Sequence, residues 1–313
     1  MKRKLIGITL LGFASGLPYM LVFSTLSAWL RDVGISLTEI GFFAWLVLTY
    51  SFKFLWAPLV DRYSIPILGA FGKRKSWILF SQVIILFSLM GMSVIDPIQN
   101  LKLLALFAFF AAFFGSVQDV AIDALRIEMG DAKEQGNLAA SYQLGYRIAI
   151  LVASSMALIF ADILDWSNVY QIMSLFMIIG IFGALICVES VNHEIALLRI
   201  DLALLGAFKD FFSRFGLWAA GLLLLIISTY RFTDIVMGPM AMPFYIDMGF
   251  TKTEIGALVK TVALTTSIIG FFAGGLIIKY LKLSTSLLIG GGGVLITNLF
   301  FAYVASSTPN ISL

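Results

Sequence analysis

Apolar residues occur in this sequence as blocks of roughly 20, and a short polar connection separates each block from the next. The blocks fall at about 5–30, 39–60, 77–95, 101–125, 138–162, 168–188, 215–245, 254–280 and 284–305. A helix of ~20 residues crosses ~30 Å of hydrocarbon and satisfies its own backbone hydrogen bonds there. The blocks therefore predict an all-α polytopic membrane protein with about nine transmembrane helices.

The composition excludes several other classes of protein. The chain is 60% hydrophobic and 12% charged, whereas soluble domains are about 45–50% apolar. A net charge of +3 without a basic patch argues against nucleic-acid binding. With one cysteine and one histidine, we expect no internal disulfide, no His/Cys metal site and no cofactor. Phosphate-loop and hydrolase motifs are absent from the sequence, so we expect no enzyme.

The distribution of basic residues predicts how the chain is oriented in the membrane. Fourteen of the 21 Lys and Arg residues fall in alternate connections, counted from the N-terminus, and three fall in the others. Cytoplasmic loops carry the excess of Lys and Arg. This predicts a cytoplasmic N-terminus and, with nine spans, a periplasmic C-terminus. The first apolar block is too long for a cleaved signal peptide, so we expect it to remain as a span.

An internal repeat predicts the domain organisation. The segment Asp32–Gly41 returns as Asp247–Gly256, with six identical positions, and both copies enter the membrane from the same side. Parallel repeats are typical of two six-helix halves around a central pathway. We expect an N-terminal six-helix bundle (1–190), a cytoplasmic interfacial linker (191–214) and a partial C-terminal bundle of three helices (215–313). An oligomer or a second polypeptide would complete the C-terminal bundle.

Charged residues within the apolar blocks are the first candidates for a functional site, because a charge in hydrocarbon costs roughly 2.5–3.5 kcal/mol on insertion scales. Asp119 and Asp123 lie four residues apart on one helical face, with Arg126 and Glu128 close behind. Repulsion between two carboxylates favours protonation of one of them. The pair is therefore a candidate for proton coupling, and the alternative is a structural gate with the cytoplasmic bases.

Other polar residues in the blocks are candidates for solute binding. Arg147 lies about nine residues into its block, beside Tyr146, and could hold an anionic group of a solute or neutralise Asp119. Arg231 and Asp234 could line a site or satisfy each other within one helix. For Lys53 and Lys260 the alternative is that their long stems reach the interface. The predicted solute-binding set is Gln118, Tyr146, Arg147, Arg231, Asp234, Lys260 and Lys53.

The connection after the second block carries a further charged group. Asp61 and Arg62 end that block, and the basic run Lys73–Lys75 follows. A carboxylate beside Arg at a helix end can lock one conformation and release it in another. We therefore predict a cytoplasmic gate that includes Asp61 and Arg62.

Four stretches of this sequence resemble the AmpG-type muropeptide permeases of the major facilitator superfamily, and distantly the acetyl-CoA transporters. They are Gly12–Pro18, Lys53–Arg62, Gln118–Ala124 and Gly145–Arg147. The stretch from Asp61 to Lys75 is similar to a lengthened form of the loop motif that shapes the cytoplasmic gate in that superfamily. The second half departs from this motif, since Ile278 stands where the acid is expected.

The resemblance implies a major facilitator fold and a bacterial inner-membrane permease that imports anhydro-muropeptides with protons, as part of cell-wall recycling. The implied partners are a muropeptide-like solute, protons and membrane lipid. Permeases of this kind have at least twelve helices, so the resemblance also implies a C-terminally truncated chain. The alternatives are a non-transporting remnant, a ligand-binding or structural membrane protein, and a transporter of another anionic solute such as an acyl-CoA-like compound.

Overall fold

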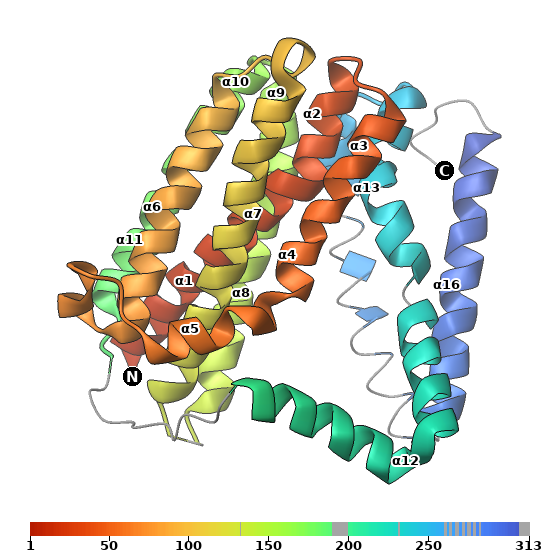
Figure 1. The fold of residues 1–313 in the computed structure, drawn as a ribbon. Coiled ribbons are helices and arrows are strands. Elements are labelled where there is room, and N and C mark those ends of the chain that lie inside the picture. Colours follow the sequence, from red (N-terminus) through yellow and green to blue (C-terminus); the bar gives the residue numbers. More distant parts are fainter. Residues whose placement is uncertain are drawn as a thin grey trace.

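The computed structural model describes residues 1–131, 133–189, 200–230, 232–259 and 283–306, together with single residues between 260 and 282. These parts of the chain are helical and contain no β-strand, which confirms the all-α class. The elements from α1 to α11 form one bundle, and α12, α13 and α16 lie beside it (Figure 1). We call the end at which the chain starts, at the bottom of Figure 1, the base, and the opposite end the apex.

The bundle is built from α-helices, several of which are joined end to end through short π or 3₁₀ segments. These elements are α1 (Lys2–Met20), η1 (Leu21–Thr25), α2 (Leu26–Asp32), α3 (Leu37–Phe43), η2 (Ala44–Leu46), α4 (Val47–Ser51), η3 (Lys53–Leu55), α5 (Ala57–Arg62), η4 (Leu68–Phe71), α6 (Lys73–Ser93), α7 (Pro97–Glu128), α8 (Gln135–Leu151), η5 (Val152–Met156), α9 (Ala157–Ala161), α10 (Trp166–Leu175) and α11 (Met177–Ile186).

The later elements are α12 (Ile200–Tyr230), α13 (Phe232–Asp247), α14 (Lys252–Glu254), η6 (Ile255–Val259) and α16 (Leu283–Ala305). Helix α12 bends at Gly216, whose φ of 71° and ψ of 164° are not helical. The predicted linker 191–214 lies partly outside the described residues, because residues 190–199 are not among them. The predicted domain boundaries therefore stay predictions.

Six helical stretches in the described residues are long and apolar enough to cross a membrane. They are Lys2–Asp32, Lys73–Ser93, Pro97–Glu128, Gln135–Ala161, Trp166–Ile186 and Lys209–Tyr230. The first five match the predicted spans 1, 3, 4, 5 and 6, and the sixth matches the first part of span 7. Helix α16 lies at the predicted ninth span, whereas most of the predicted eighth span is outside the described residues.

The helix of the predicted second span, 39–60, is interrupted. Its residues form α3, η2, α4, η3 and α5 in succession, with Phe52 at non-helical angles (φ −91°, ψ 12°). Pro58 follows in the first turn of α5. Proline lacks an N–H and clashes with the carbonyl four residues earlier, which disfavours a continuous helix here. The apolar pattern located the segment, but it did not predict these breaks.

Helix α1 is the centre of the bundle. Its residues from Gly7 to Pro18 are almost all buried, and it packs against α7, α8 and α11. The contact with α8 is a close backbone approach, since a Cβ on Gly12 would overlap the carbonyl of Tyr142. On the other helix, a Cβ on Gly145 would overlap the carbonyl of Thr9. Small residues permit such approaches between membrane helices.

We predict that Gly145→Ala destabilises the protein by about 1–3 kcal/mol, because backbone cannot move away as a side chain can. Gly136→Ala is the matched control on the same helix, since no atom lies within 4 Å of its Cβ position. Thermal unfolding of both variants in detergent measures the difference. Equal melting temperatures for Gly145→Ala and the parent would show that the approach of α1 to α8 is not tight.

Candidate functional site

Asp119 lies in the last third of α7, on the side that faces α1. The hydroxyl of Ser15 donates a hydrogen bond of 2.5 Å to Asp119 Oδ1. The neighbouring Gln118 is fully buried and donates from Nε2 to the carbonyl of Ala14 at 2.9 Å. Two successive residues of α7 are thus bonded to two successive residues of α1. These bonds fix the depth at which Asp119 lies in the bundle.

Tyrosines from two helices lie around this carboxylate. Tyr50 of α4 and Tyr142 and Tyr146 of α8 are close enough to Asp119 to interact with its charge. The rings of Tyr142 and Tyr146 are stacked with centroids 6.2 Å apart, and Tyr19 packs edge to face on Tyr50 at 5.3 Å. We call this group the Asp119 cluster: Ser15, Tyr19, Tyr50, Asp119, Tyr142 and Tyr146.

The two candidate carboxylates of α7 occupy different environments. Asp119 has no ion pair among the described residues, although Lys53 and Asp123 lie within electrostatic range of it. The Asp123 side chain is 45% exposed and pairs with Arg126 at 3.6 Å. A carboxylate that is partly withdrawn from water and has no cation partner is costly unless a proton or a ligand neutralises it. Of the two, Asp119 is therefore the stronger candidate for a site that changes its charge during function.

The other predicted solute-binding residues are placed as follows. Arg147 is half-buried, lies within electrostatic range of Tyr146 and makes no ion pair in the described part of the chain. Lys53 is exposed. The side-chain amide of Gln118 is turned towards α1, and its oxygen finds no hydrogen-bond partner there. The amide nitrogen of Gln118 therefore contributes to helix packing, and its role as a solute contact stays a prediction.

Three predicted site residues cannot be placed. Arg231 and Lys260 lie outside the described residues. Asp234 belongs to α13, but its side chain is also outside the described part. The structure therefore brings Tyr146 of α8 to Asp119 of α7, with Lys53 within electrostatic range of the carboxylate. The contribution of the later helices to the site stays a prediction.

A second group of charges lies at the base, around Arg74. Its guanidinium is 3% exposed and pairs with Asp61 at 2.5 Å and with Glu128 at 2.9 Å. It also donates to the carbonyl of Val60 at 3.0 Å. Glu189 accepts hydrogen bonds from the backbone N–H groups of Arg74 and Lys75. Arg74 thus connects the end of α5, the start of α6 and the end of α7.

This arrangement differs from the predicted gate. Asp61 was expected to act with Arg62, but Arg62 is exposed and its guanidinium lies 5.6 Å from the ring centroid of Tyr63. Arg74 is the residue that pairs with Asp61. Arg74 also pairs with Glu128, which lies close to Arg126 in the sequence. The basic run Lys73–Lys75 was a signal that this connection matters. The path of the chain after α5 shows that Arg74 is the residue of this run whose side chain points inward.

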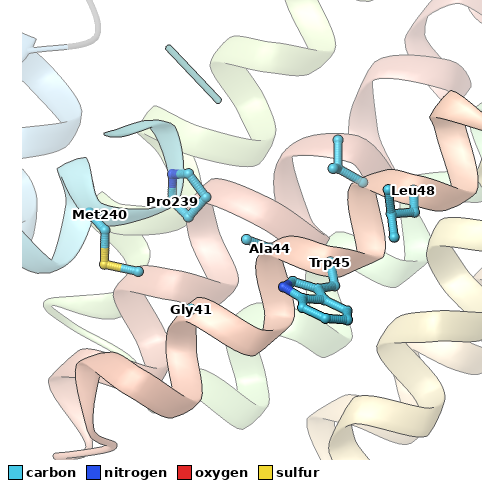
Figure 2. Close-up of a pocket in the computed structure, with 7 residues that line it drawn as sticks. Gly41, Ala44, Trp45, Leu48, Pro239 and Met240 are labelled. Carbon is cyan, nitrogen blue, oxygen red and sulfur yellow. The ribbon is translucent and has the colours of Figure 1, made fainter. Parts of the chain in front are cut away.

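A cavity of about 470 Å³ lies between the second span and α13. Figure 2 shows its lining residues, which come from both segments: Gly41, Ala44, Trp45, Val47, Leu48, Pro239 and Met240. No charged side chain is among them. Specific small-molecule sites combine apolar walls with a few placed polar groups. This cavity is therefore a weaker candidate for a solute site than the Asp119 cluster.

Comparison with known proteins connects this geometry to a family. The profile of the Major Facilitator Superfamily matches residues 8–313. "Putative transporter AmpG 4" of Rickettsia felis is 33% identical over an alignment of 318 positions, which covers 98% of this chain and 75% of the relative. "Anhydromuropeptide permease" of Escherichia coli K12 is 36% identical over 286 residues.

The match to the Escherichia coli permease covers 91% of this chain, but the chain spans only 57% of that relative. An uncharacterised protein of Haemophilus influenzae is 35% identical, with 97% of this chain and 71% of the relative covered. The profile match extends over nearly the whole chain, and the apolar helices fit a multi-pass membrane protein. The chain therefore belongs to the Major Facilitator Superfamily of membrane transporters.

Proposed function

We propose that this chain imports anhydro-muropeptide-like solutes across the bacterial inner membrane as a secondary transporter, and that it is not an enzyme. The observation that carries the proposal is the 36% identity to an anhydromuropeptide permease over 91% of the chain. The basic residues in alternate connections support a cytoplasmic N-terminus. In this orientation the base of the bundle, with Arg74, faces the cytoplasm.

We further propose that the Asp119 cluster is where solute and proton meet. Its tyrosines offer aromatic surface with hydroxyl groups, and Arg147 offers a guanidinium that can hold a carboxylate in two parallel hydrogen bonds. Asp119 would take up the coupling proton, since it is half-buried and has no cation partner in the described residues. Asp123 is already paired with Arg126 and would therefore take up the coupling proton less readily.

Asp119→Asn tests the coupling role, because the amide keeps the shape of the side chain but cannot bind and release a proton. We expect loss of proton-driven accumulation of solute, by at least tenfold, while exchange of solute across the membrane persists. Uptake and exchange by reconstituted protein measure the two quantities. Asp210→Asn, on the exposed surface of α12, is the matched control. Uncoupler-sensitive accumulation by Asp119→Asn at the parent's level would rule out Asp119 as the proton carrier.

The Arg74 group at the base is proposed as the cytoplasmic gate. Removal of one partner of a buried ion pair costs about 3–5 kcal/mol, because the other charges stay buried without compensation. We expect Arg74→Gln to lower the melting temperature strongly and to reduce uptake, since Glu128 is only 14% exposed. Arg62→Gln, at the exposed neighbouring arginine, should leave both nearly unchanged. Equal effects of the two substitutions would contradict the central role of Arg74.

The substrate itself is tested by uptake of labelled anhydro-muropeptide into cells that lack their own permease and express this chain. Membrane insertion is checked in parallel, and a proton uncoupler serves as the control. We expect uptake that the uncoupler abolishes. Ligand-dependent thermal stabilisation of the purified protein without uptake would instead favour a ligand-binding protein. Uptake of an acyl-CoA-like anion in place of the muropeptide would reassign the substrate class.

A further inference from the structure

The two copies of the internal repeat meet at the apex and have the same local structure. Gly34 and Gly249 both adopt positive φ, at 89° and 87°. Each turn is followed by a capping box, in which Ser36 pairs with Glu39 and Thr251 with Glu254. The repeat therefore presents two equivalent aspartates, Asp32 and Asp247, at the ends of α2 and α13. Each aspartate lies close to a cation from the other copy's half of the chain.

Arg31 binds Asp247 through two hydrogen bonds. Its Nε donates to Asp247 Oδ1 at 2.6 Å, and a terminal nitrogen donates to Oδ2 at 2.9 Å. These side chains are 27% and 38% exposed. Paired parallel bonds between guanidinium and carboxylate are among the stronger charged contacts, because they fix geometry as well as charge. The contact joins residues 216 positions apart and fastens α2 to α13.

Lys252 makes the reciprocal contact. Its Nζ lies 2.9 Å from Asp32 and 3.9 Å from Asp162, and 5.6 Å from the ring centroid of Trp166. Trp166 Nε1 donates to the same Asp32 oxygen at 2.6 Å. The backbone N–H of Thr253 donates to Asp162 at 2.6 Å. The start of α14 is therefore held by two carboxylates and a tryptophan of the first bundle.

Apolar contacts support these ion pairs. Met242 of α13 and Ile255 of η6 are 4% and 0% exposed, and both belong to the apolar cluster that contains Leu30 and Ile40 of the first bundle. In the described residues, the ion pairs that join the first bundle to the later helices are all at the apex. The base cluster around Arg74 connects elements of the first bundle only.

We propose that Arg31–Asp247 and Asp32–Lys252–Asp162 form a latch that holds the apex closed, and that its release is the step that opens this end of the molecule. The inference rests on the proposed transport function, but it concerns a conformational balance rather than the solute. The latch is reciprocal, because each of the two equivalent aspartates of the repeat pairs with a cation from the opposite half of the chain. Both contacts must therefore break together when the halves separate.

The test uses purified protein without solute, so it does not depend on the identity of the substrate. A cysteine is introduced as Met242→Cys, at a position that the closed apex shields. Its rate of labelling by a hydrophilic maleimide reports how often the apex opens; the native Cys187 is buried and is measured alone as background. The double variant Arg31→Gln/Lys252→Gln removes both cations. We expect labelling to accelerate roughly 5–30-fold, the change in population that loss of a small stabilising term produces.

Three controls make the result specific to the latch. The exchange Arg31→Asp/Asp247→Arg should restore protection, whereas either reversal alone should not. Arg214→Gln, which breaks an exposed pair with Asp210, should leave the rate unchanged. At about 1 M salt, where the screening length is roughly 3 Å, the parent should label faster. Equal labelling of the parent and the double variant, with melting temperatures that show both folded, would overturn the latch. Failure of the exchange to restore protection would also overturn it.

Discussion

The contact between α1 and α8 is the interaction on which the rest of this structure depends. Gly12 and Gly145 let the two backbones approach without intervening side chains. This approach brings Tyr142 and Tyr146 of α8 against α1, where Ser15 and Ala14 also bind α7. Within hydrocarbon there is no hydrophobic force between helices, so packing and hydrogen bonds of this kind determine the arrangement.

Charged groups in this bundle follow a clear division. At the base, Arg74 is shared by Asp61 and Glu128. At the apex, Arg31 and Lys252 meet carboxylates from the other half of the chain. Between these two ends, Asp119 is bonded to a serine rather than to a cation. A charge that is already paired stabilises one arrangement, whereas a half-buried carboxylate without a cation can respond to a proton or a solute.

Parts of the site could be predicted and parts could not. Asp119 was identifiable because a carboxylate within an apolar block is costly and rare. Its partner Ser15 was not identifiable, since a serine in a small-residue stretch reads as packing. Arg62 was assigned to the gate because it follows Asp61 directly, but the chain turns after α5 and brings Arg74 to that carboxylate instead. Adjacency in sequence therefore did not predict which arginine pairs with Asp61.

The helical class, the position of most spans and the existence of a repeat could all be predicted from local sequence patterns. These follow from local physics: apolar length, helix period and the residues that cap and turn the backbone. The charges that pair across the apex and the central residue at the base could be identified only from the packed fold. Such pairs join residues 216 and 220 positions apart. Their geometry depends on how whole helices lie against each other, and no local pattern encodes that arrangement.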